Sequence, residues 1–147
     1  MKQRFAILVH RLAIARVGRE TGNVHRIADC SGRGLAPGVH RSGEFAARMG
    51  GEEFAMFFPT MKLAAALEVA ERVREGVLNL RIPHEKSLTS EFVTVSIGVV
   101  SCVPEWELEF DQLLQAADDA LYESKTSGRN RITAGDLSAG KESDRTD

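Results

Sequence analysis

The sequence predicts an α/β (α+β) domain, a mixed sheet with helices against one face, and three patterns support this prediction. Residues 92–100 alternate between β-branched apolar side chains and other, mostly small or polar ones, as a strand does. Residues 61–80 and 110–121 repeat apolar side chains at spacings of three and four, which predicts two amphipathic helices. Paired glycines at 50–51 separate two apolar runs, as in a hairpin. Elements in this order with short loops are typical of a layered domain.

The length and composition are those of one globular domain. The 147 residues suffice for a single core, with 43% hydrophobic and 27% charged residues. No apolar run is long enough to cross a bilayer, and Cys30 and Cys102 show no spacing typical of a metal site or a disulfide framework. We therefore expect a soluble cytoplasmic protein with no membrane partner.

Positive charge is concentrated in the first third of the chain. Residues 1–48 contain nine Lys or Arg and three Asp or Glu, although the whole chain has a net charge of -2. A basic arm of this kind is compatible with nucleic-acid or nucleotide contact, and equally with arginines on solvated faces. The net charge gives no further support for such contact, and we expect no nucleic-acid partner.

The first element is a short buried strand at Phe5–Val9, after which the pattern fails. From His10 to Gly43 neither the strand period nor the helix period is sustained, so this part is expected to be irregular. The hairpin follows, with strands at Phe45–Met49 and Glu53–Phe58.

A helix is expected over Met61–Leu80, with Thr60 as its N-cap. The next strand is Phe92–Val100, where Gly98 indicates that another backbone approaches closely. The apolar stripe of the last helix consists of Phe110, Leu113, Leu114, Ala117, Ala120 and Leu121.

The last helix is expected to end at a C-cap on Gly128, and a short strand at Arg131–Thr133 closes the domain. From Gly135 to Asp147 only Leu137 is strongly apolar, which predicts a disordered tail.

Three motifs in this order resemble a known family. Arg48–Phe54 reads RMGGEEF, Val93–Val99 reads VTVSIGV, and Ala117–Ile132 reads ADDALYESKTSGRNRI. Together they resemble the GGDEF domain, the catalytic module of bacterial diguanylate cyclases, over about residues 41–132. The resemblance divides the chain into a degenerate N-terminal part (1–43), a GGDEF core (44–134) and the tail (135–147).

The resemblance implies a fold and a reaction. The family's fold is similar to the palm of nucleotide cyclases and polymerases, a mixed sheet with flanking helices. Its reaction condenses two GTP molecules into cyclic di-GMP with loss of two pyrophosphates. Two domains face each other as a homodimer, each presenting one GTP, and the cofactor is Mg²⁺ or Mn²⁺.

The GGEEF motif supplies the expected catalytic and metal-binding residues. By resemblance, Glu52 is a metal-binding carboxylate, and Glu53 helps to activate the attacking hydroxyl or binds metal. Gly50 and Gly51 make a bare turn that lets backbone amides approach the nucleotide. Outside this context, two glutamates at a hairpin are more often a solvated edge.

Further residues are implied to bind nucleotides. Lys125 and Arg129 match positions that contact the triphosphate; four residues apart, they are expected on one side of the helix end. Taken alone, they would serve the helix dipole. Arg41 and Glu44 stand at the spacing of the family's inhibitory product site, with Glu in place of Asp; a plain surface loop is the alternative. Asn23 stands in for a guanine-reading Asp.

The resemblance breaks at the end of the first strand, where the family has a metal-binding Asp. Here His10 and Arg11 follow Val9, and no carboxylate comes before Glu20. Losing such a ligand commonly lowers the rate by orders of magnitude. We therefore expect an impaired diguanylate cyclase; the alternative is a catalytically inactive module that binds GTP or cyclic di-GMP. Genuine degeneration and a shifted reading frame across about 10–43 both explain the loss.

Overall fold

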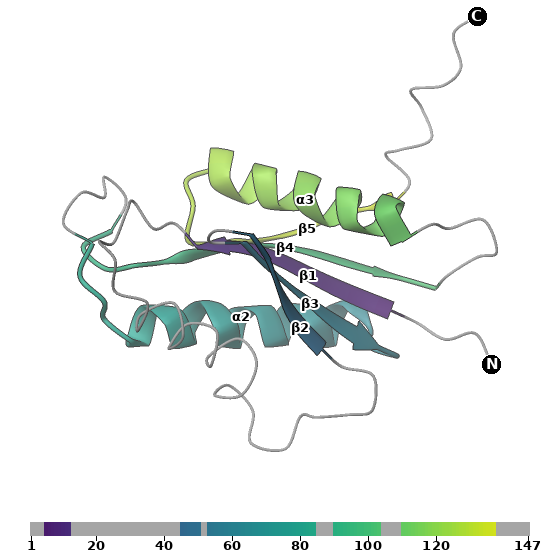
Figure 1. The fold of residues 1–147 in the computed structure, drawn as a ribbon, viewed down its shortest axis with the longest axis horizontal. Helices are drawn as coiled ribbons and strands as arrows, with labels where there is room; N and C mark the ends of the chain where they lie inside the picture. Colours follow the sequence, from purple (N-terminus) through teal and green to yellow (C-terminus); the bar gives the residue numbers. More distant parts are fainter. Residues whose placement is uncertain (1–4, 13–44, 51–52, 85–89, 104–109, 138–147) are drawn as a thin grey trace, which may run out of the picture.

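The structure is a computed structural model, and it describes residues 5–12, 45–50, 53–84, 90–103 and 110–137. Five strands form one sheet in the order β2-β3-β1-β4-β5 (Figure 1). The strands are β1 (Phe5–Leu12), β2 (Phe45–Gly50), β3 (Glu53–Pro59), β4 (Val95–Cys102) and β5 (Ile132–Ala134). All neighbouring pairs are antiparallel except β4 and β5, which are parallel. The mixed sheet predicted from the sequence is therefore confirmed.

Helices α2 (Leu63–Asn79) and α3 (Phe110–Thr126) cover opposite faces of this sheet. Side chains of α2 pack with Phe54, Met56 and Phe58 of β3. Side chains of α3 instead pack with Val100 and against Ala55 and Phe57. The expectation that both helices share one face was wrong.

The reason lies in β4, which is buried on both faces. Thr94 and Ser96 are small polar residues, yet only 3% and 2% of their surfaces are exposed. Small side chains on their side of the strand let α3 lie close to it. A Cβ built on Gly98 would stand 2.1 Å from the carbonyl oxygen of Ala117, so the close backbone approach predicted at Gly98 is confirmed.

Helix α2 begins later than expected. Its N-cap is Lys62, in an extended conformation and with no side-chain capping bond. Thr60 has φ of 65°, whereas an N-cap residue needs an extended backbone, so the expected cap was wrong. The apolar stripe is confirmed at its centre, where Ala66, Ala70 and Val73 are buried.

Strand β4 also begins later, at Val95. The residues before it pair instead with the segment after α2: Phe92 bridges to Pro83, and the Val93 amide donates to the Ile82 carbonyl (2.9 Å). Apolar and other residues alternate in the sequence both before Val95 and within β4. The expected strand was therefore too long at its N-terminal end.

Residues after β5 extend the packed domain by a few positions. The Gly135 amide donates to the Val99 carbonyl (2.8 Å), and Leu137 packs against the cluster under α3. The expected tail therefore contributes contacts as far as residue 137, and residues 138–147 lie outside the described part. None of the described helices has the length and apolar character needed to cross a membrane.

Candidate functional site

The β2–β3 hairpin carries the expected catalytic motif. Gly50 ends β2 and pairs with Glu53, the first residue of β3, across a register irregularity after Arg48. The predicted hairpin is thus confirmed. The Glu53 side chain is half-buried at this end of the sheet. Gly51 and Glu52 lie outside the described residues, so their expected roles stay predictions.

The end of β1 lies beside the hairpin. In the antiparallel register, Arg11 is the partner of Glu53 on one side and of Ser96 on the other. Residues paired across strands share a face of the sheet, so Glu53, Arg11 and Ser96 form one row. The Ser96 hydroxyl is buried and makes no hydrogen bond within the described part of the chain.

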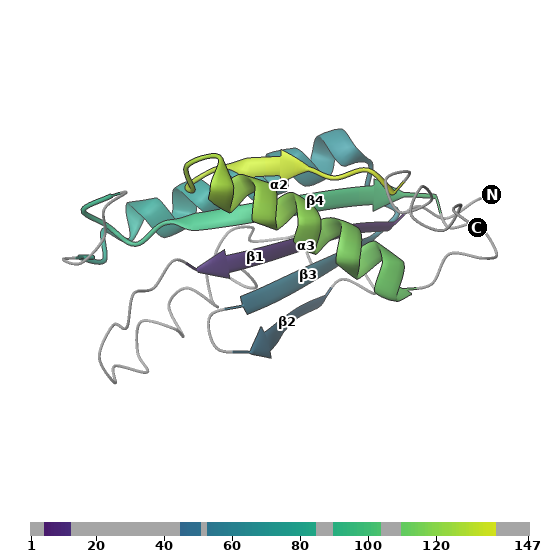
Figure 2. The same cartoon turned by 90° about the horizontal axis from the view of Figure 1, so that it is seen from above.

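The C-terminal end of α3 lies at the same end of the sheet. The buried Ser124 hydroxyl donates to the carbonyl oxygen of Ile97 (2.9 Å), the residue next to Ser96, and its oxygen lies 2.7 Å from Thr133 Oγ1. These bonds fix the last turn of α3 beside the first residues of β4 (Figure 2). Sequence reasoning missed Ser124, although it continues the buried stripe of Ala117, Ala120 and Leu121 at helical spacing.

Lys125 and Arg129 follow at this end, but not as the helical spacing implied. Lys125 is half-buried in the last turn of α3, which ends at Thr126. Arg129 lies beyond the helix, exposed, with φ of 61°. The expectation that Lys125 and Arg129 lie four apart on one helix was therefore wrong. Lys125 lies on the last turn of the helix, and Arg129 lies in the turn that follows it.

That turn is left-handed at successive residues. Gly128, Arg129 and Asn130 have φ of 117°, 61° and 47°. The Arg129 amide donates to the Ser124 carbonyl (3.0 Å), which closes the helix end as a C-cap does. The C-cap predicted at Gly128 is confirmed. The two non-glycine residues that follow were not expected to be left-handed.

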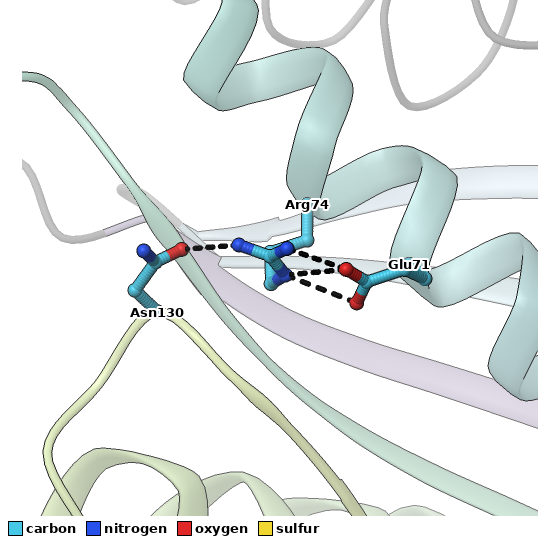
Figure 3. Close-up of polar contacts among 3 residues, drawn as sticks. All are labelled: Glu71, Arg74 and Asn130. Carbon is cyan, nitrogen blue, oxygen red and sulfur yellow. Dashed lines mark hydrogen bonds and ion pairs between the residues drawn. The ribbon is translucent and has the colours of Figure 1, made fainter.

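A side chain from the opposite face of the sheet reaches this turn. Arg74 of α2 donates through Nη1 to Asn130 Oδ1 (3.0 Å) and through Nε to Glu71 Oε2 (3.0 Å), and its Nη2 also bonds Glu71 (Figure 3). The Arg74 bond lowers the pKa of Glu71, which therefore stays charged. Sequence reasoning missed this group. Glu and Arg three apart predict only a surface pair, and no local signal links residue 74 to residue 130.

The described residues do not make a complete site for Mg²⁺ or Mn²⁺. Glu53 is a hard carboxylate donor of the kind these cations prefer. At the end of β1, however, His10, Arg11 and Leu12 offer no carboxylate. Within the described ranges no three His, Cys, Asp or Glu side chains gather in a group that could hold a metal ion. Asn23, Arg41 and Glu44 also lie outside the described residues.

Comparison with known proteins identifies relatives of this arrangement. Residues 34–131 match the family described as "Diguanylate cyclase, GGDEF domain". Diguanylate cyclase A of Treponema denticola is 43% identical over 94 residues, which are 63% of this chain and 24% of that protein. Diguanylate cyclase DgcM of Escherichia coli is 42% identical over 94 residues, 64% of this chain and 21% of that protein. The matches therefore span about a quarter or less of these curated relatives.

Solved structures agree with the sequence matches. The GGDEF domain of DgcB from Caulobacter crescentus, solved in complex with c-di-GMP, superposes with a TM-score of 0.71 at 30% identity. The superposition covers 90% of this chain and 78% of that one. The structural similarity thus reaches beyond residues 34–131, where the sequence match lies.

Proposed function

Because this chain belongs to the GGDEF domain family of diguanylate cyclases, we propose that it carries out their reaction at a reduced rate. The reaction condenses two GTP molecules into cyclic di-GMP and releases two pyrophosphates. In this proposal Glu53 helps to activate the attacking hydroxyl, and Lys125 and Arg129 bind the phosphates. Gly50 and Gly51 let the backbone approach the nucleotide.

One observation supports this proposal above the others. The row of Glu53, Arg11 and Ser96 and the end of α3 with Lys125 meet at one end of the sheet, although they come from distant parts of the chain. A carboxylate and a lysine from distant parts of the chain at one end of the sheet suit a phosphate-bearing substrate whose hydroxyl must lose a proton.

The reduced rate follows from the residue opposite Glu53. A cationic residue, Arg11, stands there in the strand register, and the end of β1 carries no carboxylate. Two-metal phosphoryl chemistry depends on carboxylates that hold the cations between the reacting oxygens. Mg²⁺ or Mn²⁺ remains the expected cation, with Glu52 and Glu53 as its expected ligands. With that set incomplete, turnover is expected to be orders of magnitude slower than with a full one.

The test is GTP turnover by the purified chain with Mg²⁺ or Mn²⁺, following cyclic di-GMP directly. Slow formation of product is expected, and Glu53→Gln should abolish it because the amide cannot accept the proton. Product at the same rate from Glu53→Gln would contradict the role of Glu53. No product from a folded chain would contradict the enzymatic proposal.

The alternative is a binding module without turnover, and the cationic residue opposite Glu53 is the observation that favours it. Such a domain binds GTP or cyclic di-GMP through Lys125, Arg129 and, for the product, Arg41 and Glu44. Calorimetric titration with each nucleotide separates the two functions. Binding without cyclic di-GMP formation favours the module, and neither binding nor product contradicts both.

Two further parts of the proposal concern assembly and location. Activity is proposed to require a homodimer, because each domain presents one GTP to the other. Turnover per chain should then rise with protein concentration until the dimer is fully formed. The proposed location is the cytoplasm, where GTP is available.

A further inference from the structure

The left-handed turn that carries Arg129 requires support from outside itself. An Arg with φ of 61° occupies a strained region that non-glycine residues rarely adopt, and such a residue persists only where its surroundings impose the conformation. Asn130, with φ of 47°, tolerates this region better because its short polar side chain forms local hydrogen bonds. The turn therefore depends on the bonds that hold it.

Two of those bonds are local to the turn. The Arg129 amide donates to the Ser124 carbonyl, and Arg131 Nε donates to the Arg129 carbonyl at a longer 3.4 Å. The flanks of the turn are tied to β4, because the Ser124 hydroxyl donates to the Ile97 carbonyl and the Ile97 amide donates to the Arg131 carbonyl (2.9 Å). These bonds leave residues 128–130 between two anchored ends.

The bond from Arg74 to Asn130 adds a contact from another element to the middle of the turn. Arg74 belongs to α2, whereas the turn follows α3, so this bond links the layers on the two faces of the sheet beside its β5 edge. The Arg74 side chain is only 18% exposed, and the Glu71 carboxylate accepts hydrogen bonds from the other side of its guanidinium (Figure 3). The guanidinium therefore has little freedom, and Asn130 is held at a fixed place.

We propose that Arg74 and Asn130 are positioning residues that hold the left-handed turn so that Arg129 points at the phosphate group of a bound nucleoside triphosphate. The proposal rests on the proposed function, since it takes Arg129 as a phosphate contact. In this proposal neither Arg74 nor Asn130 contacts the nucleotide. Their effect passes through the backbone of residues 128–130.

The test uses the whole chain and a non-hydrolysable GTP analogue with Mg²⁺, with affinity measured by calorimetry. Asn130→Gly keeps the positive φ and removes the acceptor, and Arg74→Gln removes the donor fork; each should weaken binding by about fivefold, the value of one hydrogen bond. Asn130→Asp keeps an acceptor for Arg74 and tolerates the conformation, so it should keep the turn in place, and its added negative charge should weaken binding less than Asn130→Gly does. Arg72→Gln removes the same charge from an exposed position of α2 and is the matched control.

A double variant separates positioning from general damage. Once Arg129→Ala has removed the phosphate contact, adding Asn130→Gly should weaken binding no further. Losses that add in the double variant would overturn the proposal. So would unchanged affinity in Asn130→Gly when Arg129→Ala alone weakens binding.

Amide hydrogen exchange tests the turn without any nucleotide. The Arg129 amide should exchange at least about tenfold faster in Asn130→Gly and Arg74→Gln, and at the original rate in Asn130→Asp and Arg72→Gln. If the unaltered chain does not bind the analogue, the proposed function is wrong. The exchange rates then decide whether Arg74 and Asn130 hold the turn, and unchanged protection in both variants overturns the inference.

Discussion

Single glycines decide how closely the layers of this domain approach. At Gly98 a Cβ would meet the Ala117 carbonyl oxygen at 2.1 Å and the Leu121 nitrogen at 2.5 Å, both in the backbone of α3. Backbone atoms of a packed helix have no rotamer to change. Any side chain at this position must therefore push α3 away from β4. That shift would strain the bond from Ser124 of α3 to the Ile97 carbonyl of β4.

We expect Gly98→Ala to lower the free energy of unfolding by about 3 kcal/mol, the upper part of the range for overpacked cores. Gly76→Ala is the matched control. It lies within α2, where replacing Gly by Ala should raise the free energy of unfolding by about 1 kcal/mol. Urea denaturation followed by circular dichroism measures both. Equal effects of the two substitutions would contradict the close approach at Gly98.

The residues of the site differ in how far the sequence could predict them. Gly98 and Gly128 were predicted because glycine in a strand or after a helix has few other uses. Arg74 and Asn130 were missed because their bond joins positions 56 apart in the sequence, and only the folded chain brings them together. The left-handed backbone of Arg129 was missed for a related reason, since one of the bonds that hold its turn comes from α2.

At the scale of elements, the register of β1 has the greatest consequence for function. The sequence predicted this strand only to Val9, because His10 and Arg11 interrupt its apolar run. The structure continues it to Leu12, because the exposed backbone edges of β3 and β4 offer partners on both sides. Propensity decided less here than pairing, as is common in sheets. The extra residues place Arg11 opposite Glu53.

Arg11→Asp is expected to replace the cationic residue opposite Glu53 with a hard oxygen donor. If the missing carboxylate limits the reaction, cyclic di-GMP formation should rise by roughly tenfold or more, and so should affinity for Mn²⁺. Arg11→Asn introduces a side chain of the same size as Asp but without its charge. It should raise neither the rate of cyclic di-GMP formation nor the affinity for Mn²⁺. Equal rates for Asp and Asn would show that the missing carboxylate does not limit turnover.

The two helices show what periodicity predicts and what it does not. The stripes of α2 and α3 were predicted well because burial of one helix face leaves its mark every three or four residues. Which face of the sheet each helix covers was predicted wrongly. Small polar residues such as Ser96 did not indicate a second covered face, although Ser96 is buried beneath α3. Small or polar residues occur both where a strand faces solvent and where a helix packs closely on it. The pattern of residue types alone does not separate these two situations.

At the scale of the whole molecule, β1 joins two halves of the sheet. It pairs with β3 on one side and with β4 on the other, so β2 and β3 have no direct ladder to β4 and β5. The sequence match to the family begins only at residue 34, yet the fold needs this strand.

Removing residues 1–12 should therefore abolish cooperative folding, because both halves would present unpaired edges and lose the strand between them. Removing residues 138–147, which begin after Leu137, is the control and should leave the midpoint of unfolding unchanged. Thermal unfolding followed by circular dichroism compares the two. A cooperative transition in the chain lacking residues 1–12 would contradict the central role of β1.

The central place of β1 also sets the order of events during synthesis. The strand made first has as one of its partners β4, which ends at Cys102, about ninety residues later. At about 5–20 residues per second, the ribosome takes roughly 5–20 s to deliver that partner. Both edges of this apolar strand are unpaired until β3 is made, and one edge stays unpaired until β4 follows. The yield of this domain in a cell should then depend on translation speed and chaperone supply as much as on the stability of the finished fold.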